Sequence, residues 1–281
     1  MNIKIIIASF FLFLLSFSFT GPGDVKPMKI LHQMYDSIKN IKTLRVKVTG
    51  VERNENKFIL SASEYKVQTS PRKIYLNNKE KKIEILYNPE LYGSKAIVKP
   101  HTFPYVTVSL DPTGSIMRKN QHYSINEVGY TFIGNSIALT ISKDKDGIAN
   151  FAYLGKSQKN GHSCYLLEYE NKNFAYTNYT VGEKETASSL ANKLSVNDFI
   201  LRDKNGLVND FGYLKKGTIL KVPTLYCKKA VLFIDEKLML PVSISLFDDV
   251  GLFESYEYLN IVINKPFADD DFKKDNKNYG F

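Results

Sequence analysis

The segment Thr43-Leu44-Arg45-Val46-Lys47-Val48-Thr49 gives the clearest structural signal in the chain. Its apolar side chains alternate with polar ones, and this period of two is typical of a strand with one buried face. Directly upstream, residues 28–41 are apolar at every third or fourth position behind Pro27, which predicts one amphipathic helix. The change from a helical period to a strand period predicts an α+β protein.

Strand-like segments continue through most of the chain. Turn residues separate most of them, and Asn160-Gly161 is a favoured pair for a two-residue hairpin loop. Such short spacings predict an antiparallel meander rather than alternating helices and parallel strands. The apolar residues of 121–142 follow neither a helical nor a strand period clearly. We expect a helix or an irregular segment there that covers the sheet. The predicted strands are 58–61, 64–68, 72–76, 82–87, 96–99, 105–110, 151–156, 164–170, 230–235, 241–247 and 252–263.

The composition excludes several protein classes. The chain has 281 residues, of which 43% are hydrophobic and 24% charged, and its formal net charge is +9. These values exclude a disordered polymer, a collagen and a multi-pass membrane protein. The two cysteines are too few for a Cys-rich zinc module, and the four histidines lack metal-ligand spacing. We expect no metal, no cofactor and, since no basic run is dense, no nucleic-acid partner.

The first 20 residues have the pattern of a secretory signal peptide. Lys4 precedes the uncharged run Ile5–Phe19, which Gly21-Pro22-Gly23 ends before it reaches the length of a membrane helix. An uncleaved anchor is the alternative. No cysteine lies near the cleavage region, so we expect an exported protein, periplasmic or outer-envelope associated, that is not a lipoprotein.

The sequence pattern changes at residues 176–223, where two short strand-like segments flank two helical runs. We interpret this segment as an insert with the order strand, helix, helix, strand. Tyr179-Thr180-Val181 forms the first strand, and Ser195 is expected to cap the second helix. This block resembles a LysM module, although Lys184 occupies a position where such modules place Gly. The residues that carry the resemblance are Tyr179-Thr180-Val181, Glu185-Thr186, Leu190-Ala191-x-x-Leu194-Ser195-Val196 and Leu214-x-x-Gly217-x-x-Leu220-x-Val222-Pro223.

LysM modules bind chains that contain N-acetylglucosamine, such as peptidoglycan. The resemblance implies a groove between the first strand–helix loop and the loop before the last strand. A LysM fold kept only as a spacer is the alternative. The sugar-binding residues implied are Glu185, Thr186, Ala187, Asn209, Phe211 and Tyr213.

The remaining parts, residues 24–175 and 224–281, resemble the LolA/LolB-like lipoprotein-carrier fold, an incomplete β-barrel closed by helices. Val231–Asp235, Leu240-Pro241 and Asp249-x-Gly251 match its closing hairpins. The whole chain is also similar to a bacterial envelope family of unknown function (domain of unknown function 1571 type). The stretches that carry this similarity are Ile38–Leu44, Pro71–Tyr75, Phe103–Tyr105, Leu110–His122 and Tyr279–Phe281.

The carrier resemblance implies an antiparallel half-barrel with an apolar concave face that shields a lipid or lipoprotein acyl chain from water. The alternative is a barrel whose interior is filled by its own side chains. The inward positions of the alternating strands give the expected cavity residues Val46, Val48, Tyr75, Tyr105, Val108 and Tyr256.

The stretch from Asp111 to His122 supplies candidate rim residues. Arg118, Lys119 and His122 are suited to holding an anionic headgroup at the barrel mouth. A turn followed by a solvated face is the simpler interpretation. Asp111 with His122 is also a conceivable acid–base pair, but no nucleophile or oxyanion element accompanies them.

The two cysteines allow two interpretations. His162 and Cys164 are two apart on a strand and face the same side, which is a nucleophile pattern. However, Cys164 and Cys227 flank the insert in an oxidising compartment, which favours a disulfide over catalysis, with a buried free pair as a further alternative. Near the end, we expect Asp269–Asp271 at the start of a short terminal helix.

The sequence therefore predicts a non-catalytic envelope protein. Its half-barrel is expected to bind a lipid or other apolar ligand, and its LysM-like module to attach it to peptidoglycan. One alternative is an envelope hydrolase that uses Asp111 with His122, or Cys164. The other is a purely structural interaction protein.

Overall fold

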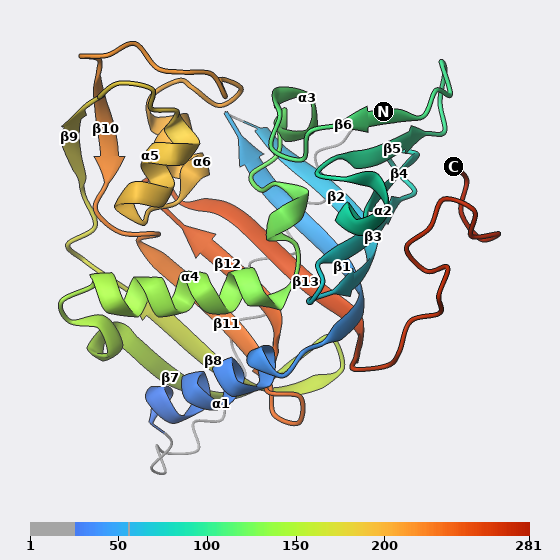
Figure 1. Cartoon of the computed structure of the whole chain (residues 1–281). Coiled ribbons are helices and arrows are strands. Elements are labelled where there is room, and N and C mark those ends of the chain that lie inside the picture. The colour runs from blue at the N-terminus through green and yellow to red at the C-terminus, as the bar shows by residue number, and fades with distance from the viewer. Residues whose placement is uncertain (1–25, 56) are drawn as a thin grey trace, which may run out of the picture.

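The computed structural model describes residues 26–55 and 57–281 (Figure 1). The predicted signal peptide lies outside these residues. Helix α1 (Pro27–Lys39) begins at a proline, whose fixed φ suits the first turn. One face of α1 is buried in the core, as its period predicts. Among the described residues, we find no helix with both the length and the apolar character needed to cross a bilayer.

One antiparallel sheet of eleven strands forms the body of the protein. Its order is β6-β5-β4-β3-β2-β1-β13-β12-β11-β8-β7, so the first strand lies beside the last one. This pairing joins the N-terminal meander to the closing strands across the whole length of the chain. The strands are β1 (Thr43–Asn54), β2 (Lys57–Gln68), β3 (Lys73–Asn78), β4 (Ile83–Tyr87), β5 (Ala96–Pro100), β6 (Val108–Leu110), β7 (Phe151–Lys159), β8 (His162–Glu170), β11 (Lys229–Asp235), β12 (Pro241–Phe247) and β13 (Leu252–Ile263).

The long hairpin of β1 and β2 pairs from Thr43 with Gln68 to Asn54 with Lys57 without a break. The two strands predicted at 58–61 and 64–68 are therefore a single strand. The predicted hairpin at Asn160-Gly161 is present, since it joins β7 to β8. The meander prediction is confirmed for β1 to β6.

Helices cover one face of the sheet, and the sheet stays open (Figure 1). Helix α4 (Tyr130–Lys143) packs beside α1; in the view of Figure 1, α4 crosses β8, β11 and β12, and α1 lies against β7. The edge strands β6 and β7 do not pair with each other. The predicted fold class, an α+β half-barrel with covering helices, is confirmed. The body also contains the one-turn α-helices α2 (Pro89–Tyr92) and α3 (Ser115–Arg118) and the 3₁₀ helices η2 (Ile125–Glu127) and η3 (Gly147–Asn150).

Residues 176–223 form the predicted order of strand, helix, helix and strand. The two strands make their own small sheet, and a separate hydrophobic core lies beneath the helices. Ser195 ends the first helix in a left-handed conformation, and Asn197 caps the second by accepting a hydrogen bond from the Ile200 amide at 3.0 Å. The cap predicted at Ser195 was therefore wrong by two residues. The elements are β9 (Tyr176–Thr180), α5 (Ala187–Leu194), α6 (Asp198–Lys204) and β10 (Ile219–Pro223).

The last 18 residues, 264–281, run as an irregular strap along the convex face of β1 to β5. The short terminal helix predicted there was wrong. Asp271 instead forms ion pairs with Lys66 at 2.5 Å and Arg45 at 3.5 Å. The Tyr279 ring stacks on Tyr75 at 3.8 Å between centroids. Side-chain anchors on the sheet, rather than helical hydrogen bonds, hold this segment.

Candidate ligand-binding cavity

A cavity of about 400 Å³ lies between α4 and the concave face of the large sheet. Each of the eleven strands contributes at least one lining residue, from Leu110 on edge strand β6 to Phe151 on edge strand β7. A flat sheet cannot surround one space in this way, so the sheet curves around the cavity. The volume lies within the range of about 300–1,000 Å³ typical of small-molecule sites.

The larger part of the lining is apolar. Helix α4 supplies Phe132, Ile133 and Ile137, whose spacing of one and four residues places them on one helix face. These three side chains are only half-buried, although they lie over the sheet. Opposite them, Ile244 and Tyr258 come from β12 and β13. The interior is therefore an open apolar space rather than a filled barrel.

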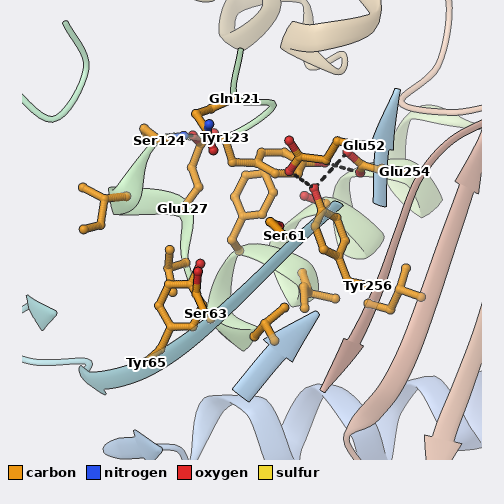
Figure 2. A pocket seen from close by; sticks show the side chains of 18 of the residues that line it. Glu52, Ser61, Ser63, Tyr65, Gln121, Tyr123, Ser124, Glu127, Glu254 and Tyr256 are labelled. Carbon is orange, nitrogen blue, oxygen red and sulfur yellow. Dashed lines mark hydrogen bonds between the residues drawn. The ribbon is translucent and has the colours of Figure 1, made fainter. Parts of the chain in front are cut away.

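At one end of the cavity a group of polar side chains converges, and Figure 2 shows how Glu52, Tyr123, Glu254 and Tyr256 point toward one another. We call Glu52, His122, Tyr123, Glu254 and Tyr256 the inner polar cluster. The Tyr256 hydroxyl donates to Glu52 Oε1 at 2.6 Å and lies 3.5 Å from Glu254 Oε2. The Tyr123 hydroxyl donates to Glu254 Oε1.

A glycine makes room for Tyr256. Gly50 lies opposite Tyr256 in the pairing of β1 with β13. A Cβ atom on Gly50 would come within 2.9 Å of the Tyr256 ring. The absence of a side chain therefore lets the ring lie across β1 and reach Glu52.

The two carboxylates of the cluster lie directly opposite each other on adjacent strands. Glu52 of β1 is the register partner of Glu254 of β13. Like charges at such a position destabilise a sheet, and burial in an apolar cavity increases the cost. An arrangement that costs stability in a cleft is typical of a binding or catalytic site.

His122 compensates one of these carboxylates. Its side chain is fully buried, its Nδ1 lies 2.7 Å from Glu254 Oε2, and its Nε2 lies 2.8 Å from the Arg53 carbonyl oxygen. Burial opposes the charged imidazole, but the hydrogen bond and the charge of Glu254 prevail and raise the pKa of His122. Burial raises the pKa of Glu254. Nε2 faces a carbonyl oxygen and so carries a proton, and the contact between Nδ1 and Oε2 needs a second proton on one of these two atoms.

Of the six predicted cavity residues, Val48 and Tyr256 line the cavity. Val46 is buried in the main core instead. Tyr75 points to the convex face, because its neighbours Leu76 and Asn78 take the inward positions of β3. Successive side chains of a strand point to opposite faces, so an error of one residue assigns a side chain to the wrong face of the sheet.

The other two predicted cavity residues lie outside the cavity. Tyr105 is 59% exposed and Val108 is 39% exposed. Strand β6 is only three residues long, and the segment before it is not part of the sheet. The predicted strand at 105–110 was too long, and the edge of the sheet leaves these two side chains in solvent.

The predicted rim residues do not gather at a mouth. Lys119 lines the cavity, but Arg118 forms an ion pair with Asp198 at 2.7 Å. Asp111 is exposed and accepts hydrogen bonds from Thr113, which lower the pKa of its carboxyl group. His122 is buried against Glu254, so the predicted acid–base pair of Asp111 with His122 was wrong.

The predicted disulfide was also wrong, since Cys164 and Cys227 are both free and buried. Cys164 pairs with Asp235 at one end of β11, whereas Cys227 lies just before Lys229 at the other end. Six residues of strand separate these ends by about 20 Å, which is far beyond the reach of a disulfide. Burial and the nearby Asp235 raise the pKa of Cys164 to about 11. The thiol is therefore protonated and poorly suited to be a nucleophile.

His162 does not activate Cys164. The His162 Nδ1 atom lies 2.6 Å from Asp235 Oδ2, and the Cys164 thiol donates to the His162 carbonyl oxygen at 3.4 Å. The imidazole is thus oriented by a carboxylate, but its partner is not the sulfur. The geometry gives no Cys–His pair for covalent catalysis.

The two loops of the predicted LysM groove do meet. Thr186 forms a bridge with Tyr213, and the Leu214 amide donates to the Glu185 carbonyl oxygen at 2.8 Å. Tyr213 is 76% exposed. The Glu185 carboxylate forms an ion pair with Lys193 at 2.8 Å, which lowers its pKa to about 2.

The other predicted groove residues are engaged in contacts away from the ridge that Thr186 and Tyr213 form. Asn209 and Asn120 exchange hydrogen bonds at 2.9 and 3.1 Å, and Phe211 lies under the guanidinium groups of Arg118 and Arg202. Ala187 is buried in the core of the small unit. Contacts with the half-barrel therefore occupy part of the predicted sugar-binding surface.

A family model described as "Protein of unknown function (DUF1571)" matches residues 217–281. The closing strands of the chain match this family. The match begins just before β10 and ends at the last residue of the strap, so it covers β13 with its cluster residue Glu254. It confirms the similarity to the family of domain of unknown function 1571 type for this part of the chain. A search of curated protein sequences finds no significant match.

Solved structures provide further similarities. One is the lipoprotein LppX from Mycobacterium tuberculosis, with 13% identity and a TM-score of 0.40 over 86% of this chain and 99% of that chain. A second is LprF from Mycobacterium bovis, with 11% identity and a TM-score of 0.41 over 85% and 96%. A third is a LolA superfamily protein from Nitrosomonas europaea, with 11% identity and a TM-score of 0.32 over 89% and 98%. These matches do not confirm the LysM-like module.

Sequence reasoning missed Glu52, Tyr123 and Glu254. A signal for two of them was present, because Glu52 is in phase with Val48 on β1, and Glu254 is in phase with Tyr256 on β13. A carboxylate on the apolar face of a strand is unusual and needs a partner. The pairing of β1 with β13 was required to show that the two carboxylates meet.

Proposed function

We propose that this protein is an exported, non-catalytic envelope protein that binds the apolar chain of a lipid or lipoprotein in its half-barrel. The observation that carries the proposal is the open apolar cavity under α4, which all eleven strands surround. Each buried methylene group contributes about 0.8 kcal/mol, so six of them contribute about 5 kcal/mol to binding. The failure of Asp111, His122 and Cys164 to assemble into a reactive group supports a role in binding rather than hydrolysis.

The test is lipid binding by a variant whose cavity is filled. Ile137→Trp places a large side chain in the cavity, whereas Ala138→Trp adds the same group to the exposed face of α4. We expect native mass spectrometry and lipid extraction to detect bound lipid in the wild-type protein and in Ala138→Trp, and little in Ile137→Trp. A wild-type protein that carries no lipid and takes none up would contradict the proposal.

We further propose that the small unit 176–223 contacts peptidoglycan at the ridge formed by Thr186 and Tyr213. The exposed Tyr213 ring, which lies beside polar backbone groups, is suited to the apolar face of a sugar. Sedimentation with purified peptidoglycan tests this attachment. We expect Tyr213→Ala to reduce co-sedimentation several-fold, and equal sedimentation of the two proteins would leave the unit as a spacer.

A further inference from the structure

The inner polar cluster carries an excess of negative charge. His122 and Glu254 form a close pair that is neutral as a unit, whether the proton lies on the imidazole or on the carboxyl group. Glu52 has no such partner. Among the described residues, its carboxylate accepts one hydrogen bond, from the Tyr256 hydroxyl to Oε1, and Oε2 accepts none.

Cations near the cavity do not neutralise Glu52. Arg53, the next residue on β1, points to the opposite face, where it forms ion pairs with Asp248 and Asp203. Lys81 and Lys119 line the cavity but are exposed, and no ion pair joins either of them to Glu52 within the described chain. A ligand that reaches the cluster therefore meets an unneutralised carboxylate.

This charge distribution discriminates between ligands by the charge of the polar head group that would reach the cluster. A carboxylate or phosphate head placed beside Glu52 would bring a second negative charge next to this carboxylate, in a mainly apolar cavity where screening is weak. A head that donates hydrogen bonds would satisfy Glu52 Oε2 and relieve the repulsion across β1 and β13. The rim predicted for an anionic headgroup is absent, because Arg118 and His122 are bound to Asp198 and Glu254.

We propose that the cavity binds an amphiphile whose head is a neutral or cationic hydrogen-bond donor, a hydroxyl or an amine, held by Glu52, and that it discriminates against anionic heads. This inference rests on the proposed function, since it requires that the apolar chain occupies the cavity. Tyr256 acts as a positioning residue, because its hydroxyl fixes Oε1 of Glu52 and leaves Oε2 for the ligand.

The test compares three amphiphiles with the same twelve-carbon chain. Dodecylamine, monolauroylglycerol and laurate, each below its micelle concentration, compete with an uncharged fluorescent probe for the delipidated protein at pH 7. We expect dodecylamine and monolauroylglycerol to displace the probe at concentrations at least tenfold lower than laurate. In Glu52→Gln the preference for the amine over laurate should fall to about threefold or less.

The matched control is Glu64→Gln, which removes one carboxylate from β2 on the face away from the cavity, where Glu64 pairs with Lys79. It should keep the wild-type preference. Glu52→Gln should unfold at the wild-type temperature or above, since it removes a like-charge contact. Equal or tighter binding of laurate by the wild-type protein would overturn the inference alone. Failure of the probe and of all three amphiphiles to bind would overturn the proposed function as well.

Discussion

The substitution Phe272→Ala tests whether the C-terminal strap is part of the cooperative structure. Phe272 is 5% exposed and is the buried member of the strap in the convex core with Tyr75, Leu86 and Ile97. Its carbonyl oxygen accepts a hydrogen bond from the side chain of Asn88 at 3.1 Å. The substitution removes the ring and leaves the backbone contact in place.

The magnitude follows from the size of the group removed. Truncation of a buried phenylalanine costs about 3–5 kcal/mol. The strap lies outside the sheet and can move toward the space left by the ring, so we expect the lower end, about 3 kcal/mol. For a chain of this size, 1 kcal/mol corresponds to a shift of about 2–4 °C in the melting temperature. The expected decrease is therefore about 6–12 °C.

Urea unfolding followed by circular dichroism measures the effect, since the chain contains no tryptophan. Phe281→Ala is the matched control, because Phe281 belongs to the same core but is only partly buried. We expect it to lose about 1 kcal/mol of unfolding free energy. A loss below 1 kcal/mol in Phe272→Ala, with an unchanged m-value, would show that the strap opens independently of the sheet, and would refute this reasoning.

Two further predictions concern buried ionisable groups. The pKa of His122 is raised by Glu254 against the effect of burial, and that of Glu254 is raised by burial, so the folded state binds protons more tightly than the unfolded state. The part from His122 is fully present below the ordinary His pKa of about 6.5, and the part from Glu254 below the ordinary Glu pKa of about 4.3; each is lost as the pH rises through the folded pKa of that group. The free energy of unfolding in urea should therefore fall as the pH rises above these ordinary values, and the double variant His122→Gln, Glu254→Gln should lack this fall. A flat wild-type profile would contradict the pairing. Burial raises the pKa of both Cys164 and Cys227. A thiol reagent at pH 8 should therefore label neither cysteine in the native protein and both in urea. A single reactive thiol in the native state would show that one of the two sites is open to solvent.

Much of the fold was accessible from the sequence because local periods report local structure. The helical period upstream of Thr43 predicted α1, and the period of two after it predicted β1. The order of elements in 176–223 followed from the apolar spacing and the turn residues, although the cap of the second helix was placed two residues too early. The weakest prediction concerned residues 121–142. This region consists of a mostly irregular segment that lines the cavity, followed by helix α4.

The candidate site was less accessible from the sequence, because its parts come from strands far apart in the chain. Tyr75 was placed in the cavity because a period of two defines two faces of a strand without saying which one is inside. Cys164 and Cys227 flank the insert in sequence, but the register of β8 with β11 places them at opposite ends of a strand. The position of a residue along its partner strand is not contained in its local pattern.

By itself, the sequence determined that this chain forms a mainly antiparallel α+β protein with a βααβ insertion, since apolar periodicity and turn residues act over a few neighbours. Only the tertiary structure decided that the sheet curves around an open cavity, and that Glu52 lies opposite Glu254. These two residues are brought together by one long-range pairing, that of β1 with β13. This pairing is stabilised by the burial of apolar side chains from the whole sheet, which no local pattern reveals. The charge of the site arises from that pairing, and not from either strand alone.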